Sequence, residues 1–379
     1  MPTYLDHNAT TPLDARVLEA MLPYLSGPYG NASSLHRFGR AARDAVERAR
    51  EQVAALVGCQ PGEIVWTSGG TEANNLAVKG VAAVRRGRLL YGATEHPAVM
   101  EAALALAGER DVAAVAVDAQ GIVDWSALAA QLAQGPVALV ALMRANNETG
   151  VVQDLARAAA LVHEAGAWLH VDAVQAAGRI AVDFRALGAD LMSLSSHKLY
   201  GPKGIGALVR RAEVDLVPLH HGGPQEKGLR GGTENVAAIV GFGVAAELAR
   251  QELERRTRHT LALRERLEAG LATLPGVRVF AAGVERLPNT VQFALPGFDG
   301  EALLMQLDRK GFAVSSGSAC ASGKHEPSHV LLAMGVEPEI ARGAIRVSLG
   351  VDNTAEQIDA FVETLRALHA SLSRTVVPV

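Results

Sequence analysis

The sequence predicts an α/β protein built from two domains. Short apolar runs alternate with longer amphipathic segments over the first two thirds of the chain. This alternation is typical of βαβ units, in which a mostly parallel sheet is covered by helices on both faces. A length of 379 residues and a hydrophobic content of 49% also allow a core larger than one domain usually buries.

Seven apolar runs are expected to form the strands of a seven-stranded, mostly parallel sheet. In chain order they are residues 63–66, 89–91, 112–117, 137–142, 168–171, 191–194 and 206–209. After them, the pattern over residues 233–273 predicts one long helix, in which charges that interrupt the apolar positions indicate a solvated face.

The last part of the chain predicts a smaller α+β domain, because short strands mix there with helices. The expected strands are residues 277–280, 290–293 and 344–349, and the expected helices are residues 300–310 and 354–373. We therefore expect a large domain over residues 14–254 and a small domain made of residues 1–13 and 255–379.

Composition and charge favour a small-molecule substrate. The net charge is −4, with 36 Lys and Arg against 40 Asp and Glu, so no basic field attracts nucleic acid or an anionic membrane. No export signal pattern and no run of about 18 apolar residues is present, so we expect no membrane span. Cys59 and Cys320 lack CxxC spacing, which disfavours disulfides and thiolate metal sites and fits a reducing cytoplasm.

The first motif with chemical meaning is TSGGTEANN at residues 67–75, between a strand-like run and a helical pattern. Glycines allow close backbone approach, and the N–H groups and dipole of a helix start attract an anion, so the turn suits a phosphate. It lacks the spacing of a nucleoside triphosphate loop. Taken alone, the same pattern also fits a tight strand-to-helix connection without a ligand.

The second motif is the apolar run WLHVDAVQ at residues 168–175, which places Asp172 at a strand end. A desolvated carboxylate there needs a cationic or hydrogen-bonding partner, and a pyridinium nitrogen is one such partner. From local sequence alone, an Asp that caps the next helix is the favoured alternative.

The third motif is SLSSHKLYGPKG at residues 193–204, where a strand runs into Lys198. A lysine held at the end of a buried strand loses its proton more readily, as a Schiff-base nucleophile requires. Ser195 and His197 add donors that suit a phosphate. Lys203 lies between Pro and Gly, so we expect it to be a turn residue.

A phosphate turn, an acid for a ring nitrogen and a Schiff-base lysine are together what pyridoxal 5′-phosphate (PLP) requires. At this point the chain resembles the class V aminotransferase-fold enzymes, of PLP-dependent fold type I, and specifically the group I cysteine desulfurases of the NifS/IscS type. The resemblance covers nearly the whole length. It is carried by YLDHNATTP at 4–12, ATEHPAV at 93–99, ANNETG at 145–150, RGGTEN at 230–235 and SSGSAC at 315–320.

The resemblance implies a role for each matching residue. The lysine that binds PLP covalently would be Lys198, the acid on the pyridine nitrogen Asp172, and the donor to the ring oxygen Gln175. His96 would stack on the ring and help proton transfer. The residues expected to hold the phosphate are Gly70, Thr71, Ser195, His197 and, from the neighbouring subunit of a homodimer, Thr233.

Asn147 and Arg346 complete the expected substrate clamp, with Asn147 also next to the cofactor. A guanidinium binds a carboxylate through two parallel hydrogen bonds, which lysine cannot copy. Without the resemblance, Arg346 would be interpreted as a surface arginine on an edge strand and His96 as a satisfied polar residue.

Cys320 lies in a run of Gly, Ser and Ala that predicts a mobile loop rather than a packed core. The resemblance implies that its thiolate takes sulfur from L-cysteine as a persulfide and leaves alanine. A small buried hydrophobe is the alternative for a lone cysteine, and we favour it for Cys59.

Three other functions stay open from sequence. A class V aminotransferase would use Lys198 and Asp172 but have no task for Cys320, a selenocysteine lyase differs only in the chalcogen, and a phosphate- or partner-binding protein would keep only the scaffold. The sulfur acceptor is open too. It would be an iron–sulfur scaffold or a sulfur carrier for cofactor or transfer-RNA thiolation. Housekeeping members dock the scaffold protein through a longer C-terminal tail, whereas this chain stops soon after its last expected helix. His325 and His329 are four apart, but Pro327 interrupts them, so no metal site is expected.

Overall fold

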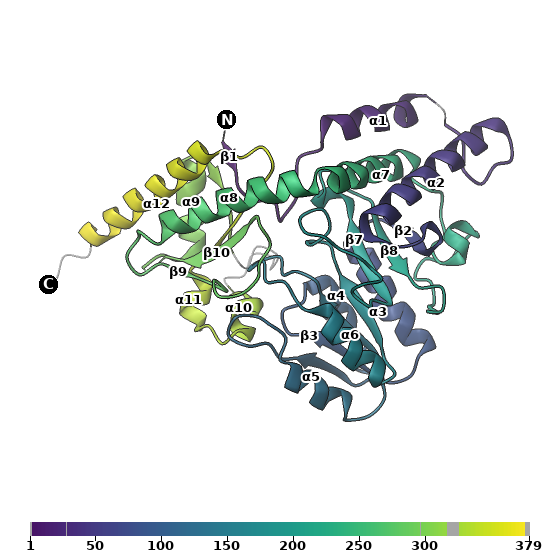
Figure 1. Ribbon diagram of the computed structural model, residues 1–379, viewed down its shortest axis with the longest axis horizontal. Helices are drawn as coiled ribbons and strands as arrows, with labels where there is room; N and C mark the ends of the chain where they lie inside the picture. Colours follow the sequence, from purple (N-terminus) through teal and green to yellow (C-terminus); the bar gives the residue numbers. More distant parts are fainter. Residues whose placement is uncertain (1, 28, 296, 317–325, 376–379) are drawn as a thin grey trace.

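The computed structural model describes residues 2–27, 29–295, 297–316 and 326–375 (Figure 1). The expected seven-stranded sheet is confirmed, in the order β2-β8-β7-β6-β5-β3-β4. Only β8 runs antiparallel to its neighbours, β2 and β7, and the other pairs are parallel. The strands are β2 (Ile64–Thr67), β3 (Arg88–Gly92), β4 (Val112–Val115), β5 (Val137–Met143), β6 (Trp168–Asp172), β7 (Leu191–Ser195) and β8 (Gly206–Arg210).

Helices cover both faces of this sheet because its strands are apolar on both sides. In β8, Leu208 faces one hydrophobic core while Ala207 and Val209 face the other. Helices α3 (Gly70–Val84) and α4 (Pro97–Leu104) pack on the Leu208 side. The opposite side is covered by α2 (Arg37–Val57), α5 (Trp125–Leu132), α6 (Leu155–Glu164) and α7 (Val236–Gln251), with α1 (Ala15–Ser26) beyond them.

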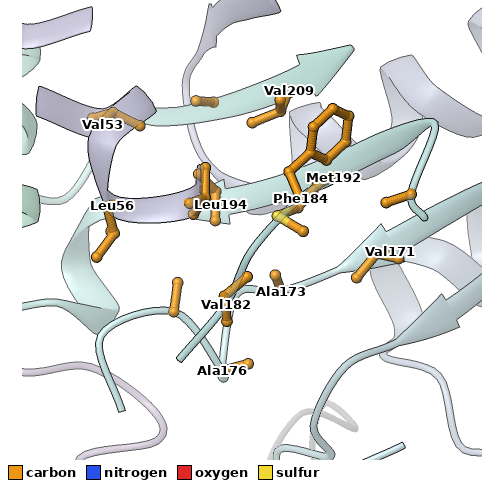
Figure 2. Packing of buried hydrophobic residues seen from close by; sticks show 14 of the residues in the cluster. Val53, Leu56, Val171, Ala173, Ala176, Val182, Phe184, Met192, Leu194 and Val209 are labelled. Atoms are coloured by element: carbon orange, nitrogen blue, oxygen red, sulfur yellow. The ribbon is translucent and has the colours of Figure 1, made fainter. Parts of the chain in front are cut away.

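Figure 2 shows part of this second core, where side chains of α2, β6, β7 and β8 meet those of Val182 and Phe184. Phe184 is fully buried, as are Met192 and Val209 of the sheet. Burying such side chains contributes about 1.5–3 kcal/mol each, so the sheet is a firm platform for residues at its strand ends.

The single helix expected over residues 233–273 is wrong in one respect, because the structure has two helices there. α7 ends at Gln251 and α8 (Leu253–Leu271) begins after Glu252, whose φ of −101° and ψ of 5° are not helical. Glu252 accepts hydrogen bonds from three guanidinium groups, those of Arg16, Arg255 and Arg256. Figure 1 shows the two helices following one another from the large sheet to the small one.

The smaller unit has a four-stranded antiparallel sheet in the order β12-β13-β10-β9. Its strands are β9 (Arg278–Val279), β10 (Thr290–Ala294), β12 (Ser315–Ser316) and β13 (Ala344–Ser348). Its helices are α9 (Gly300–Arg309), α10 (His329–Ala333), α11 (Pro338–Arg342) and α12 (Ala355–Thr375). A separate hydrophobic core joins this sheet to α8, α9 and α12. The boundaries 1–13, 14–254 and 255–379 themselves stay a prediction.

The N-terminal segment connects the small sheet with the pocket described below. β1 (Thr3–Tyr4) pairs in parallel with β11 (Phe312–Ala313), and Leu5 is buried in the core of the small unit. Asp6 forms a β-bridge to Ser348, and the N–H of Thr11 then donates to the carbonyl of His197 at 3.0 Å. Within the described ranges, no helix is long and apolar enough to cross a membrane.

Candidate active site

A cavity of about 320 Å³ lies where β5, β6 and β7 end and α3 and α4 begin. Ligands of open α/β sheets bind in this place, outside the carboxyl ends of the strands. Ten of the residues that the sequence singles out line this one cavity: Gly70, Thr71, His96, Asn147, Asp172, Gln175, Ser195, His197, Lys198 and Arg346.

One end of the cavity is formed by the start of α3, which begins at Gly70 directly after β2. The N–H groups of a first helical turn have no partner within the helix, so they and the helix dipole attract an anion. The glycines here are required by space. A Cβ on Gly70 would lie 2.9 Å from Cγ2 of Val174, and one on Gly206 of β8 would lie 2.6 Å from the backbone of Gly69.

Asp172 is buried at the end of β6, and both of its carboxylate oxygens are held. Oδ2 accepts from Nδ2 of Asn74 at 2.7 Å, and Oδ1 accepts from the N–H of Val174 at 2.9 Å. Asp172 does not cap a helix, because turns rather than an α-helix follow β6. The alternative favoured by local sequence is therefore wrong, and the carboxylate faces the cavity.

Lys198 ends the short 3₁₀ helix η2 (Ser196–Lys198) that follows β7. Its Nζ donates to the carbonyl oxygens of Asn8 at 2.5 Å and Ala9 at 2.6 Å. Both acceptors come from the N-terminal segment, which thus forms one wall of the cavity. Lys203 does not line this cavity.

His197 lies beside Lys198, with Nδ1 3.0 Å from Oγ1 of Thr10. Burial lowers the pKa of His197 to about 4, and the nearby positive charges of Lys198, Lys203 and Arg179 act in the same direction. The imidazole is therefore neutral near pH 7 and can donate one hydrogen bond without adding a charge.

His96 begins α4 as its N-cap, and its Nδ1 accepts from the N–H of Ala98 at 3.0 Å. A neutral imidazole that accepts at Nδ1 carries its proton on Nε2. Burial lowers the pKa of His96, and the charge of Lys198 lowers it further, whereas the Asp172 carboxylate raises it. His96 is therefore a neutral group of the cavity wall that can donate a proton from Nε2.

Arg346 lies in β13 with 7% of its side chain exposed. Because β13 lies between β12 and β10, the alternative of a surface arginine on an edge strand is wrong. Nη2 donates to Oδ1 of Asp6 at 2.7 Å, and Nη1 donates to the carbonyl of Asn147 at 3.1 Å. The guanidinium is thus held at the cavity with its donors on the side of Asp6 and Asn147.

Gln175 is fixed by two neighbours. Its Nε2 donates to the carbonyl of Asn8 at 3.0 Å, and its Oε1 accepts from Arg179. Arg179 is half-buried, and its desolvation lowers its pKa to about 10; it also donates to the carbonyl of His7 at 3.1 Å. The amide of Gln175 therefore has a set orientation at the cavity wall.

Among the described residues, one expected site residue does not line this cavity. Thr233 is exposed between β8 and α7 and is absent from the cavity lining. Cys320 lies outside the described residues. Cys59 is half-buried against the larger core, and burial raises the pKa of its thiol to about 12, as the interpretation of a packed residue predicts.

Sequence reasoning missed five residues that hold the predicted ones in place: Asp6, Asn8, Ala9, Thr10 and Asn74. All five lie within motifs that it had noted, at residues 4–12 and 67–75. Their contacts cross about 100 to 340 positions of the chain, as the pairs Asn74 with Asp172 and Asp6 with Arg346 show.

A metal site finds no support in the part of the chain that the structure covers, where no group of three His, Cys, Asp or Glu side chains could hold an ion. His325 lies outside the described residues. Nε2 of His329 instead lies within hydrogen-bond distance of the carbonyl oxygen of Glu95, at 2.9 Å.

Comparison with known proteins gives one consistent result. The family model "Aminotransferase class-V" matches residues 3–361. The chain is 47% identical over 370 residues to "Cysteine desulfurase IscS" of Anaeromyxobacter sp. (strain Fw109-5), covering 96% of this chain and 91% of the relative. Among solved structures, a "NifS-like protein" superposes with a TM-score of 0.91 at 38% identity over 98% of this chain and 100% of the other. A structure titled "SspA in complex with cysteine" has a TM-score of 0.80 at 34% identity, covering 92% and 99%.

Proposed function

This chain belongs to the aminotransferase class-V family and within it is a cysteine desulfurase of the IscS/NifS type, and from that premise we propose how its residues take sulfur from L-cysteine. The observation that carries the proposal is one cavity with Lys198, Asp172 and Arg346 on its walls. The family implies PLP dependence. We assign PLP to this cavity of the chain, L-cysteine as the substrate and Cys320 as the sulfur carrier.

The residues present fit PLP. A cavity of about 320 Å³ is within the range of small-molecule sites, and a Cβ at Gly70 would intrude on its wall. The start of α3 suits the phosphate, with Thr71, Ser195 and His197 beside it. Asp172 suits the ring nitrogen because its carboxylate is buried and already held by Asn74, and Lys198 suits covalent attachment.

When bound, PLP supplies an electron sink that acidifies the Cα proton of an amino acid and weakens its Cβ–S bond. The chain's own groups do the rest. Arg346 would bind the substrate carboxylate, with Asn147 beside it, and thereby fix the orientation of the substrate in the cavity. Lys198 would take up and return the Cα proton through its amine. His96 donates a proton from Nε2 within the same cavity.

Sulfur transfer falls to Cys320. Its thiolate attacks the substrate sulfur, an S–S bond forms as the Cβ–S bond breaks, and the carbon skeleton leaves as alanine once protonated. The sum is L-cysteine plus a thiol giving L-alanine plus a persulfide, so no outside oxidant is needed. A thiol with this task must stay reduced between turnovers, which a reducing compartment such as the cytoplasm provides.

The described ends of the Cys320 segment support its reach to the substrate. On one side, Ser315 of β12 pairs with Arg346 of β13. On the other side, Ser328 donates to Glu148, the residue after Asn147. One end therefore pairs with Arg346, and the other is joined to the neighbour of Asn147 in sequence.

A homodimer completes the proposed site. Thr233 is exposed and does not line the cavity of its own chain. Both properties are required of a residue that binds the phosphate of a neighbouring subunit. The persulfide then passes to an acceptor protein, an iron–sulfur scaffold or a sulfur carrier. Capture of the acceptor by persulfide-loaded protein distinguishes the two.

The proposed function is tested by incubating the PLP-loaded protein with L-cysteine and measuring alanine and sulfide together in the presence of a reducing thiol. Equal amounts of the two products are expected. Cys320→Ala should lose both, whereas Cys59→Ala, the matched control, should keep both. Undiminished turnover in Cys320→Ala would contradict the carrier role and favour an aminotransferase.

A further inference from the structure

A buried hydrogen-bonded cluster lies between the proposed substrate site and the described end of the Cys320 segment. Oε2 of Glu148 accepts from Oγ of Ser328 at 2.5 Å and from Nε2 of Gln292 at 3.0 Å. All three side chains are buried, with exposures of 5%, 2% and 0%. Glu148 is thus a carboxyl group cut off from water, and protein groups supply its partners.

Each partner of Glu148 belongs to a different part of the site. Glu148 itself directly follows Asn147 in the turn that contributes to the cavity. Gln292 lies in β10 directly opposite Arg346 in β13. Ser328 begins α10 as its N-cap, since its Oγ also accepts from the N–H of Leu331 at 3.2 Å. Glu148 therefore connects the substrate turn, the strand beside the arginine and the start of α10.

Ser328 lies close to Cys320 in the sequence, so the position of Ser328 limits where the Cys320 thiol can lie. Ser328 follows Cys320 by eight residues, and an extended chain of that length spans at most about 29 Å. A shift of Ser328 therefore changes which points the thiol can reach. A second link acts nearby, because His329 holds the carbonyl of Glu95, next to His96.

We propose that Glu148 is a positioning residue for sulfur transfer, which acts through Ser328 to hold the end of the Cys320 segment against the substrate turn. This inference rests on the proposed function, because it presupposes that Cys320 accepts the sulfur. It assigns Glu148 no contact with the reacting atoms. Sulfur transfer requires the attacking thiolate within about 3–3.5 Å of the substrate sulfur, and releasing the anchor at Ser328 lowers the fraction of time that the thiol spends within that range.

The test uses the PLP-loaded, full-length protein and separates substrate binding from sulfur transfer. Glu148→Ala should slow formation of the Cys320 persulfide in a single turnover at least tenfold, as followed by mass spectrometry. Binding of L-alanine, followed by the visible spectrum, should stay within twofold of the parent. A residue needed only for folding of the site would change both quantities together.

Two further variants isolate the hydrogen bond itself. Ser328→Ala should slow persulfide formation as Glu148→Ala does, and the double variant should be no slower than either single one, because the same link is broken. Glu148→Gln should stay within threefold of the parent, since its amide oxygen still accepts from Ser328. Gln292, whose Oε1 has no partner among the described atoms, can turn its amide to meet the new NH₂ group.

Hydrogen exchange gives a readout that is independent of activity. In the cofactor-free protein, amides of residues 329–334 should exchange at least fivefold faster in Glu148→Ala than in the parent. The matched control is Thr260→Val, which removes a buried hydroxyl that donates to carbonyl oxygens within α8. This variant should form the persulfide and exchange the amides of residues 329–334 at the rates of the parent.

Different results would contradict the positioning role of Glu148 and the carrier role of Cys320. Persulfide formation at the parent rate in Glu148→Ala, with Cys320→Ala inactive, would overturn the positioning role alone. Sulfur release from Cys320→Ala at the parent rate would overturn the carrier role and with it the inference.

Discussion

Asn74 donates a hydrogen bond from Nδ2 to Oδ2 of Asp172 across 2.7 Å, and both side chains are buried. The pair joins the N-terminal part of α3, at the expected phosphate end, to the end of β6, at the expected ring nitrogen. One hydrogen bond therefore sets the position of the acid relative to the phosphate turn.

Replacing Asn74 with Ala should weaken PLP binding about tenfold or more, because a hydrogen bond to a charged group contributes about 1.5–3 kcal/mol. Equilibrium dialysis of PLP against the cofactor-free protein measures the effect. Asn75→Ala removes the neighbouring amide, which donates to the carbonyl of Thr71 at 3.0 Å, and should bind PLP as the parent does. Equal affinity in both variants would show that Asn74 does not position Asp172.

Arg346→Lys should raise KM for L-cysteine roughly thirtyfold, because a single ammonium cannot replace two parallel hydrogen bonds and the loss is about 2 kcal/mol. The protein should still bind PLP, since Arg346 is assigned to the substrate. Steady-state kinetics checks the first expectation and the visible spectrum the second. Arg342→Lys changes an exposed arginine of α11 and serves as the control, with an unchanged KM.

The pH dependence of turnover should report the lowered pKa of His96. Because burial lowers that pKa below 6.5, the ring stays neutral as the pH falls past 6.5, and protonation begins only further down. The acid limb that His96 contributes to kcat/KM should therefore lie below pH 6.5. Measurement from pH 4.5 to 8 on the parent and His96→Gln tests this, and a limb of the same shape in His96→Gln would assign it to another group.

Acid sensitivity of the fold should come partly from His170. Its ring is fully buried in β6, which lowers its pKa from 6.5 to about 4. The unfolded chain binds a proton at this position more readily, so the contribution of the neutral ring is complete above pH 6.5 and is lost as the pH falls toward 4. The loss amounts to about 1.4 kcal/mol at pH 5.5.

Urea unfolding at pH 7.5 and 5.5 measures this contribution. The free energy of unfolding should decrease less between the two values in His170→Gln than in the parent, although the variant starts lower. His221→Gln alters an exposed ring and should follow the parent's curve. An equal decrease in all three proteins would exclude His170 as a source of acid sensitivity.

Mixed dimers test whether Thr233 serves the neighbouring subunit. Homodimers of Lys198→Ala and of Thr233→Ala should each have little activity. In a mixed dimer, the Thr233→Ala subunit keeps Lys198 and receives Thr233 from the Lys198→Ala subunit, so one intact site returns. Activity measured after mixing, unfolding and refolding together should rise well above either homodimer. No rise would mean that Thr233 acts within its own chain.

Periodicity and local motifs were enough to predict the seven-stranded sheet, because its strands are continuously apolar and separated by helical patterns. They were not enough to end α7 at Gln251, since the contacts made at the break include that of Arg16 with Glu252, 236 positions away. The residues of the cavity were found from motifs and resemblance.

The supporting contacts were out of reach of sequence reasoning for the same physical reason. Nothing near Lys198 in the sequence indicates that its amine meets the carbonyls of Asn8 and Ala9, because backbone acceptors carry no residue-type signal. Asn74 lies in a motif that the sequence analysis noted, but an amide in such a motif can pack in a core, cap a helix or donate to a carboxylate. Only the fold shows that it meets Asp172.

The path of the N-terminal segment limits how the chain can be re-engineered. Residues 3–11 run from the smaller unit, where Tyr4 pairs with Ala313 in the two-stranded sheet of β1 and β11, past the amine of Lys198 to the carbonyl of His197. A circular permutant opened between Asp6 and Asn8 would detach this strap from one of the two hydrophobic cores. Such a permutant should fold yet carry PLP poorly, whereas one opened at an exposed loop far from the strap should be fully loaded.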